Sequence, residues 1–324
     1  MGAAPVVLVA AERRDPTADM VVSALTQRGA SVFRFDVADF PQRIHLDAQA
    51  RDGQWTGTIG DALRTMVRLE QVRGVYWRRP GPDGIADTVP ELFHSWAAAQ
   101  ADQALLQVLA ALPVNWINNP NQDRPAAHKP RQLTRAARSG LRVPRTLVTN
   151  DPDAARKFAA DLGGPVICKP ITGGERPLGP EQRNHMIPAH IIDPATLDES
   201  VRVTAHLFQQ WVDKAHDVRL TVVDGRMFGV AVHACSDGTR VDWRTDYEAL
   251  TYTPIEVPDR VAAGVCALLA YDGLRFGALD FSVDRSGAWW FLENNPAGQW
   301  MWIEKDTGLP IADAHAQFLL EGPT

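Results

Sequence analysis

The stretch FGALDFSVDRSGAWWFLENNPAGQW holds the acidic residues best spaced for chemistry. Its centre, VDRSGA, is a polar turn with a glycine between two apolar arms, which predicts a β-hairpin. We expect Asp284 to pair with Gly287 across the turn. Side-chain alternation then places three polar residues on one face of the hairpin: Asp280, Glu293 and Asn295. The two carboxylates are expected to be diagonal cross-strand neighbours.

Two carboxylates within reach of each other repel unless a cation lies between them. Their oxygen atoms suit Mg²⁺ or Mn²⁺, which commonly share one or two carboxylates with substrate phosphates. The spacing of these residues agrees equally well with a half-exposed hairpin whose polar face is in water. The hairpin therefore predicts either a metal site or a solvated surface.

Two lysines upstream of the hairpin favour a phosphate ligand. Lys169 ends the apolar run PVICK and is followed by proline, so one cation closes a buried strand. Lys129 lies in a loop before an expected helix. A single lysine is usually a solvated surface residue. Between the lysines and the hairpin, the polar stretch ITGGERPLGPEQRNH predicts either a lid that closes over phosphates or a loose hairpin.

The stretch GVYWRRPG predicts a strand that ends in two arginines. Ligands of open parallel α/β sheets bind outside the carboxyl ends of the strands, where a guanidinium could hold a carboxylate or phosphate. Two solvated loop arginines are the simpler interpretation of this stretch alone. Because successive strand residues point to opposite faces, only one of Arg78 and Arg79 should reach the cleft, and we expect it to be Arg79.

The remaining elements predict an α/β chain of three parts. Residues 5–11, 15–29 and 31–36 form a β-α-β unit with a parallel sheet, followed by a hairpin around Asp52 and Gly53, the Arg78 strand, a helix over 91–112 and a strand over 114–119. An Asn- and Pro-rich loop then marks a boundary. From about residue 206 the pattern changes to strands separated by tight turns. We therefore divide the chain at 1–120, 121–205 and 206–324.

Composition limits the classes of partner and compartment. The formal net charge of −6 gives no general attraction to nucleic acid or to an anionic membrane. Three widely spaced cysteines, Cys168, Cys235 and Cys266, fit neither a disulfide framework nor a zinc site, and a cytoplasmic location is expected. The apolar run near the N-terminus is too short for a signal peptide or a membrane span. We expect Cys168 to be a packing residue rather than a reactive thiol.

The order of these features resembles that of a known family. Lys129, Lys169, the glycine-bearing loop, QQWVDKAHDVRLTVVDGR, Asp280 and FLENNPAG together resemble the ATP-grasp ligases from about residue 120 to the end. YWRRP combined with FLENNPAGQWMWIE is similar to the microviridin-type or graspetide synthetases, which macrocyclise ribosomal peptides. The resemblance implies an ATP-grasp fold with an N-terminal parallel α/β (pre-ATP-grasp) domain, a central α+β domain with the lid loop, and a C-terminal α+β domain.

The resemblance also implies how ATP would be bound. Lys129 and Lys169 would contact its phosphates, and Asp217 would bind the ribose. The adenine would lie against a hinge segment, chiefly through backbone groups: Gln209, Gln210, Trp211 and Val212. Many relatives carry glutamate in place of Gln210, so a side-chain contact there is open.

For catalysis, the resemblance implies that Arg219 and Arg244 lie near the transferred phosphate, although Arg240 could take the place of Arg244. The metal, Mg²⁺ or Mn²⁺, would be bound by the polar face of the hairpin: Asp280, Glu293 and Asn295. ATP would phosphorylate a side-chain carboxylate of a peptide, and a hydroxyl or amine of the same peptide would displace the phosphate. The arginine pair after the YW strand, Arg78 and Arg79, would then hold the acceptor carboxylate.

The implied partner is a ribosomal precursor peptide with a leader and an acidic, Thr-rich core. One alternative is an ATP-grasp amino-acid or glutamate ligase that acts on a small molecule or a protein terminus. Another is a non-catalytic nucleotide-binding protein that recruits the precursor, against which the intact set of metal ligands argues. Ester or amide linkage, ring number, the leader-binding surface and a homodimer are left open.

Overall fold

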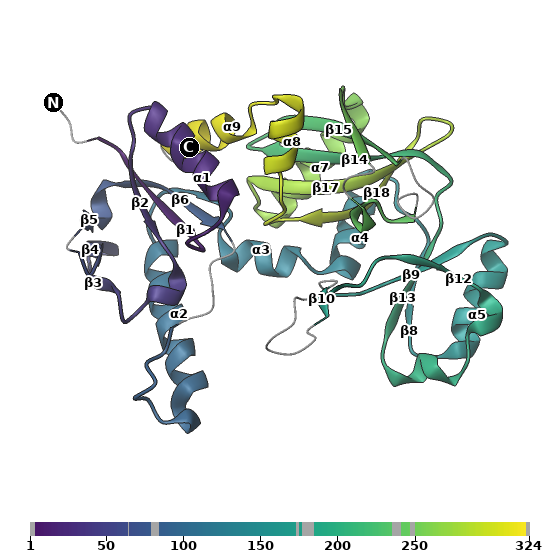
Figure 1. Cartoon of the computed structure of the whole chain (residues 1–324), viewed down its shortest axis with the longest axis horizontal. Coiled ribbons are helices and arrows are strands. Elements are labelled where there is room, and N and C mark those ends of the chain that lie inside the picture. The colour runs from purple at the N-terminus through teal and green to yellow at the C-terminus, as the bar shows by residue number, and fades with distance from the viewer. Residues whose placement is uncertain are drawn as a thin grey trace.

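The computed structural model describes residues 4–63, 65–78, 84–172, 175–176, 185–234, 241–246 and 250–321. Three regions follow one another along the longest axis (Figure 1). The N-terminal region is built on a parallel sheet, the C-terminal region on a large antiparallel sheet in the middle, and the central region on a small antiparallel sheet at the far end. Together they have the mixed α/β architecture that the sequence predicted.

The parallel sheet confirms the predicted β-α-β unit. It consists of β1 (Val6–Ala11), β2 (Ser31–Phe35), β6 (Val72–Arg78) and β7 (Asn115–Ile117), in the order β2-β1-β6-β7. Helix α1 (Pro16–Gln27) joins β1 to β2, and the side chain of Asp15 caps it by accepting from the backbone N–H groups of Thr17 and Ala18. An acidic N-cap before proline is the sequence signal for this helix start.

A second sheet and a long helix complete the N-terminal region. Strands β3 (Ile44–Arg51), β4 (Gln54–Asp61) and β5 (Met66–Arg68) form an antiparallel sheet. The predicted turn is confirmed: Asp52 and Gly53 have φ of 52° and 80°, as a two-residue hairpin turn requires. The helix expected over 91–112 is α2 (His94–Ala110), preceded by a 3₁₀ turn.

The expected Asn- and Pro-rich loop is wrong, because most of it is helical. Helix α3 (Pro120–Ala126) is capped by the side chain of Asn119, and Pro120 takes the first helical position. Proline lacks a backbone N–H, and the N–H of the first helical position has no partner within the helix. The Asn and Pro residues that suggested a loop are therefore start signals of a helix. Helix α4 (Lys129–Arg138) follows, so Lys129 is its first residue rather than part of a loop.

The central region is a small sheet with one helix. Strands β8 (Thr146–Thr149), β9 (Val166–Lys169), β12 (His190–Ile192) and β13 (His206–Gln210) lie in the order β12-β9-β13-β8. Helix α5 (Pro152–Leu162) packs on one face, with Ala155, Ala159 and Phe208 in the small core. Strands β10 (Glu175–Arg176) and β11 (His185–Met186) pair with each other, and most of the expected lid loop between them lies outside the described residues.

The large sheet has five antiparallel strands in the order β16-β15-β14-β17-β18. They are β14 (Lys214–Val223), β15 (Arg226–Ala234), β16 (Leu250–Ile255), β17 (Phe276–Asp284) and β18 (Trp289–Asn295). Helix α7 (Asp259–Asp272) covers one face, and its Leu268 joins Leu279 and Phe281 in the core beneath it. The short 3₁₀ segments are Val37–Asp39, Leu69–Gln71, Glu91–Phe93, Pro194–Thr196, Glu199–Val203 and Trp243–Thr245.

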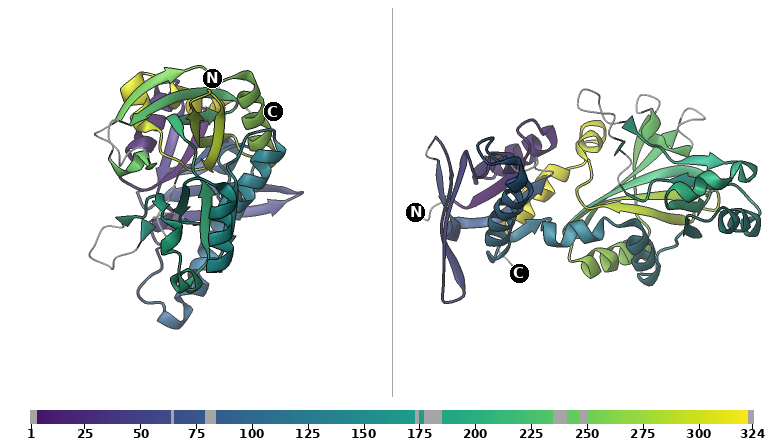
Figure 2. Two further views of the ribbon diagram at one scale, coloured as in Figure 1. Left: turned by 90° about the vertical axis from the view of Figure 1, so that its right-hand side faces the viewer. Right: turned by 90° about the horizontal axis from the view of Figure 1, so that it is seen from below.

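The end of the chain returns to its beginning. After β18, helices α8 (Met301–Thr307) and α9 (Ile311–Leu320) follow, and α9 lies beside α1 (Figures 1 and 2). One core therefore joins Val7 and Val9 of the parallel sheet to Phe276 and Ala278 of β17, with Trp300 between them. None of the described helices has both the length and the apolar character needed to cross a membrane.

Candidate active site

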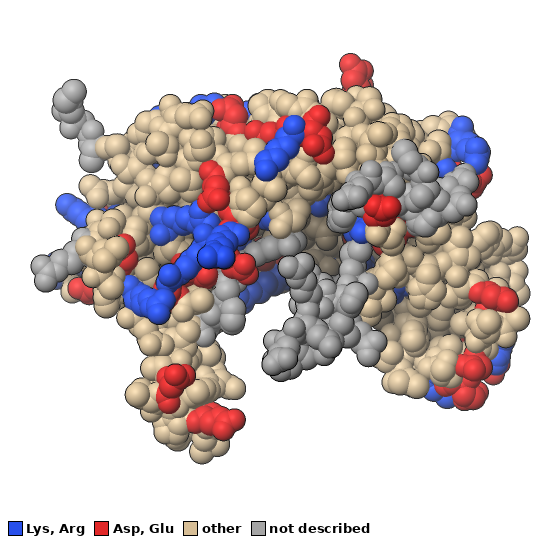
Figure 3. Space-filling model, in the orientation of Figure 1, with Lys and Arg blue, Asp and Glu red and all other residues tan. Residues whose placement is uncertain are grey.

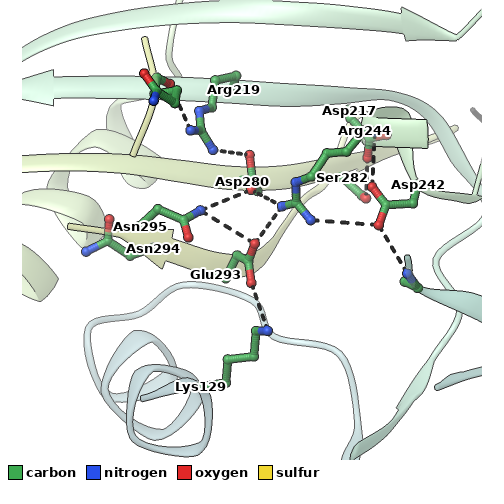
Figure 4. Close-up of polar contacts among 12 residues, drawn as sticks. Lys129, Asp217, Arg219, Asp242, Arg244, Asp280, Ser282, Glu293, Asn294 and Asn295 are labelled. Atoms are coloured by element: carbon green, nitrogen blue, oxygen red, sulfur yellow. Dashed lines mark hydrogen bonds and ion pairs between the residues drawn. The ribbon is translucent and has the colours of Figure 1, made fainter. Parts of the chain in front are cut away.

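The predicted acidic residues lie in a row across the large sheet. Strand pairing sets Arg219 of β14 opposite Asp280 of β17, and Asp280 opposite Glu293 of β18. Nη1 of Arg219 donates to Oδ1 of Asp280 over 2.9 Å, and both residues are buried, at 5% and 2% exposure. Figure 4 shows the row with Asn295 beside it. Adjacent strands thus bring together side chains that are far apart in the sequence.

The predicted pairing register of the hairpin is wrong: it is shifted by one residue next to the turn, where Val283 pairs with Trp289, and by two residues at Asp280. Asp280 pairs directly with Glu293, whereas it was expected to be a diagonal neighbour. The pairing shifts between Asp280 and Phe281, which leaves Leu292 as an extra residue in β18. Phe291 stays paired with Phe281 in the core, and the β-bulge turns Glu293 to the face of Asp280. Without the bulge, Leu292 would pair with Asp280, and Glu293 would lie on the opposite face of the sheet.

Arg244 lies between the two carboxylates. Its Nη2 is 2.5 Å from Oδ2 of Asp280 and 2.5 Å from Oε1 of Glu293 (Figure 4). Nδ2 of Asn295 lies 3.4 Å and 3.5 Å from the same two oxygens. The guanidinium therefore occupies the position of the cation that the carboxylate pair requires.

A short 3₁₀ segment, Trp243–Thr245, carries Arg244 and is anchored at both sides. Asp242 caps it, since Oδ1 accepts from the backbone N–H of Arg244, while Oδ2 accepts from Ala189 of the central region. The ring of Trp243 packs on Trp302 of α8 with centroids 5.7 Å apart. Asp242 was missed by sequence reasoning; an aspartate two residues before the arginine is the capping signal that could have identified it.

Both predicted phosphate-binding lysines lie near Glu293. Nζ of Lys129 is 3.6 Å from Oε2 of Glu293 and donates to the carbonyl of Pro170 over 2.8 Å. Lys169 ends β9 and pairs with Leu207, so its side chain lies on the face of the small sheet opposite Phe208 and α5. Burial lowers the pKa of Lys169 to about 8, although the nearby charge of Glu293 opposes this shift.

The site carries an excess of positive charge. Arg219, Arg244, Lys129 and Lys169 surround the carboxylates of Asp280 and Glu293. Burial raises the pKa of Glu293, but the neighbouring cations, Arg244 first among them, outweigh burial and hold this pKa below its ordinary value. A cation-rich, partly buried site of this kind attracts polyanions such as a triphosphate.

The predicted hinge residues connect the two sheets. Gln209 is fully buried, and its Nε2 donates to Oγ1 of Thr146 over 2.8 Å. The backbone N–H of Gln210 donates to the carbonyl of Arg145, and that of Trp211 donates to the carbonyl of Pro165. Val212 is buried. Two of the backbone donors expected for adenine are thus already used within the protein.

Asp217, the predicted ribose ligand, is buried, and both of its carboxylate oxygens have partners within the protein. Its Oδ1 accepts from Ser282 over 2.8 Å, and its Oδ2 lies 2.5 Å from Nζ of Lys214. Burial raises the pKa of Asp217 against the opposing effect of Lys214 and Ser282. Lys214, also close to the ring of Trp211, was missed by sequence reasoning, although it stands three residues before Asp217.

Arg78 does not point into the carboxylate row. It is 2% exposed, and its guanidinium donates to the segment after β18, including Oε1 of Gln299. Arg79, the residue expected to reach the cleft, lies outside the described residues. Sequence reasoning did not identify Gln299 as a residue that joins two regions of the molecule. The only feature of the sequence that could have pointed to it is its place in the FLENNPAGQW stretch.

The donor set of the row fits a hard divalent cation. Asp280 and Glu293 present carboxylate oxygens that one cationic group, Arg244, already bridges, and the amide of Asn295 lies beside them. Within the described ranges, no group of three or more His, Cys, Asp or Glu side chains could hold a metal ion. A metal at this place would therefore take its remaining ligands from Asn295 and from substrate oxygens, as Mg²⁺ commonly does.

Comparison with known proteins confirms the resemblance. Residues 6–124 match the family model of the MvdD pre-ATP grasp domain. The whole chain superposes on macrocyclase MdnB from Microcystis aeruginosa, with 29% identity, a TM-score of 0.79, and 98% of this chain and 100% of that chain covered. Macrocyclase MdnC from the same organism, solved with precursor peptide MdnA, gives 27% identity, a TM-score of 0.82, and coverage of 97% and 99%.

A third structure shows the same fold. The RiPP-associated ATP-grasp ligase of Chryseobacterium gregarium, solved with ADP and a leader and core peptide, gives a TM-score of 0.86 at 24% identity, with coverage of 98% and 96%. No curated protein matches the chain. The chain thus has the fold of the ATP-grasp ligases and resembles those that act on ribosomal peptides, as the sequence predicted.

Proposed function

We propose that the chain is an ATP-dependent peptide macrocyclase. It phosphorylates Asp or Glu side chains of a ribosomal precursor peptide and joins them to Ser or Thr hydroxyls, giving an ester, or to Lys amines, giving an amide. ADP and phosphate are the other products. Macrocyclase MdnC and the RiPP-associated ligase support this proposal, because their structures include a precursor peptide and a leader and core peptide, respectively.

One observation carries the proposal. Two carboxylates, Asp280 and Glu293, lie side by side on adjacent strands and are surrounded by cationic side chains from three other elements. A simple surface hairpin has no need for this arrangement. Bringing a triphosphate and an acidic acceptor together requires it, because both substrates are anions and must be neutralised before they can approach.

We assign the nucleotide contacts as follows. Lys129 and Lys169 hold ATP phosphates, Asp217 holds the ribose, and the hinge segment 209–212 lies against the adenine. Asp280, Glu293 and Asn295 hold Mg²⁺, or Mn²⁺, which when bound supplies positive charge to the phosphates. The low pKa of Lys169 suits a lysine that regains its full charge on meeting a phosphate.

Arg219 and Arg244 act nearest to the transferred phosphate. Both guanidiniums donate to Asp280, so their positive charge lies beside the residues that we assign to the metal and its phosphates. The acceptor carboxylate attacks the γ-phosphorus and ADP leaves, giving an acyl phosphate. The hydroxyl or amine then attacks the acyl carbon, and inorganic phosphate leaves with the proton. The protein itself forms no covalent bond, so its contribution is positioning and charge neutralisation.

The test is a reconstitution with a candidate precursor peptide that is rich in Thr or Ser and in Asp or Glu near its C-terminus. Such a peptide would be sought in a short neighbouring open reading frame. We expect peptide-dependent release of ADP and loss of one water molecule from the peptide for each ring, measured by mass spectrometry. Fragmentation after mild base treatment distinguishes esters from amides.

Other outcomes identify the alternatives. ADP release with free amino acids or glutamate, but not with peptides, would indicate a small-molecule ligase. Nucleotide and peptide binding without ADP release would indicate a recruitment protein. Wild-type protein that binds no nucleotide would contradict all three functions.

A further inference from the structure

The segment 297–299, which follows β18, is held by an arginine from the N-terminal region. Nη1 of Arg78 donates to the carbonyls of Ala297 over 2.9 Å and Gly298 over 3.1 Å, and Nη2 donates to Oε1 of Gln299 over 2.5 Å. Nε lies 3.3 Å from Oδ2 of Asp15. All three nitrogens of the guanidinium thus face acceptors within the protein, in a position where the side chain is 2% exposed.

The same segment contacts Arg219 on its other side. The carbonyl of Gln299 accepts from Nη2 of Arg219 over 3.0 Å, while Nη1 of Arg219 donates to Asp280. Gly298 is packed tightly: a Cβ there would lie 2.4 Å from Cβ of Ala278 and 3.0 Å from Nη2 of Arg219. Only glycine therefore fits at this place, and the hydrogen bond from Arg219 to the carbonyl of Gln299 links the segment to that guanidinium.

The N-terminal region holds the segment at more than one point. Oε1 of Gln299 also accepts from Oγ1 of Thr17 over 2.9 Å, and Thr17 lies in the first turn of α1, which Asp15 caps. The carbonyl of Pro296, just before the segment, accepts from Nδ2 of Asn118 over 2.9 Å. The backbone of 296–299 is therefore fixed to the start of α1 and to the ends of β6 and β7.

We infer that Arg78 is a positioning residue that fixes Arg219 on Asp280 through the segment 297–299. This inference rests on the proposed function, because Arg219 is assigned to the transferred phosphate and Asp280 to the metal. Arg78 then acts on the binding of metal and nucleotide although its own side chain touches neither. It does so from the end of a strand in another region of the molecule.

This role differs from that of an acceptor clamp, which the position of Arg78 at a strand end also suggests. A clamp needs free guanidinium donors, whereas those of Arg78 are directed to three consecutive residues of the protein. Lysine cannot replace it as a positioning residue, because a single ammonium group cannot reach the same spread of acceptors in a fixed plane.

The experiment compares Arg78→Lys with Arg28→Lys. Arg28 also joins the N-terminal region to the end of the chain, through Asp313 of α9, but this exposed pair contacts no residue of the site. Affinity for Mn²⁺–ADP is measured by calorimetry without any peptide. We expect Arg78→Lys to weaken binding roughly ten-fold or more, as for the loss of a hydrogen bond to a charged group, and Arg28→Lys to leave it unchanged.

A double-mutant cycle with Arg219→Lys separates positioning from general damage. If Arg78 acts through Arg219, the double variant should bind Mn²⁺–ADP about as weakly as the worse single variant, because the second change removes an effect already lost. Additive losses would overturn the inference. If Arg78→Lys does not fold, Gln299→Ala is used instead. This variant removes the side-chain acceptor of Arg78 at a partly exposed residue, and we expect the affinity for Mn²⁺–ADP to fall less, roughly three-fold.

Two results would replace the inference by another role. Normal Mn²⁺–ADP affinity with loss of peptide modification would make Arg78 an acceptor clamp. Normal affinity with only a lower melting temperature would make it a structural residue. Failure of the proposed function would be recognised separately, since it would appear in the wild-type protein, either as no nucleotide binding or as binding without peptide modification.

Discussion

The candidate site lies between two walls that are built differently. We call the row Arg219, Asp280, Glu293 and Asn295 the carboxylate wall, and the pair Lys169 and Gln209 the nucleotide wall. The carboxylate wall lies on long, adjacent strands whose opposite face packs Leu220, Leu279 and Phe281 into a core. The nucleotide wall lies on strands of four or five residues over a much smaller core.

Polar contacts join the two regions that carry these walls. Among the described residues these include the hydrogen bond from Nζ of Lys129 to the carbonyl of Pro170, next to Lys169, and the hydrogen bond from the backbone of Ala189 to Asp242. Polar contacts of this kind can break and form again at little cost, whereas an apolar core cannot be opened locally. We therefore expect the chemical groups to be held rigidly and the nucleotide wall to move toward them when ATP binds.

The largest effect should come from the carboxylate wall. Glu293→Gln removes one anion from the site to which we assign a metal and a triphosphate, and we expect peptide modification to fall by roughly a thousand-fold or more. The fold should persist, because the side chain lies at the edge of the buried row. Turnover is followed as ADP release with the precursor peptide.

The control is Glu304→Gln on α8. Glu304 is also partly buried and accepts from the backbone of Ala312, but it touches no residue of the site. If folded Glu293→Gln keeps near-normal turnover, Glu293 is not a metal ligand. The carboxylate wall would then lack the chemical role that distinguishes it from the nucleotide wall.

The second prediction tests whether the carboxylate wall and the parallel sheet are one folding unit. His315 of α9 is fully buried in their shared core, stacked on Trp300, and burial lowers its pKa to about 3. Unfolding restores the ordinary pKa near 6.5, so the unfolded chain binds the extra proton between these values and acid favours unfolding. From pH 7 to pH 5 this residue should cost roughly 2 kcal/mol, about thirty-fold in the unfolding equilibrium.

Chemical denaturation at the two pH values measures this cost, and His315→Leu should lose that part of the pH dependence. Hydrogen exchange compares the shared core with the central sheet. Acid should reduce the protection of the amides of β1 and β17 together and affect those of β13 less. Independent loss of protection in β1 and β17 would show that the shared core does not couple them.

The third prediction concerns the nucleotide wall. Because the pKa of Lys169 is about 8, the amine loses its charge between pH 7 and pH 9, where an ordinary lysine stays charged. If the charged amine is the form that binds phosphate, the affinity for ADP should fall about ten-fold over this range. Calorimetry at both pH values measures it. Lys169→Arg is the control, because arginine keeps its charge, and an equal fall in that variant would exclude Lys169 as the cause.

The smallest effect is expected at Cys168, directly before Lys169 but on the opposite face of β9. It packs against the small core beside α5, and burial raises the pKa of its thiol. Iodoacetamide should therefore modify the exposed Cys266 well before Cys168, and Cys168→Ala should change ADP affinity by no more than about two-fold. Rapid labelling of Cys168, seen by peptide mass mapping, would mean that the small core opens readily.

The sequence by itself determined the local elements and most of the residue types of the site. The period-two pattern of the hairpin, the apolar run ending at Lys169 and the helical stretch over 15–29 each depend on neighbours within a few positions. Their interpretation needed no distant contact, and the structure has these elements where the sequence predicted them. The resemblance to the ATP-grasp ligases added the order of the site residues along the chain.

Only the tertiary structure decided which of these side chains meet. The bulge at Leu292 sets Asp280 directly opposite Glu293, while Phe291 stays paired with Phe281 in a core to which α7 and β14 also contribute. Likewise, Arg78 binds residues 297–299 because α9 and the parallel sheet share a core. Such placements depend on which surfaces of distant elements fit each other, and that fit is a property of the packed chain and not of any local pattern.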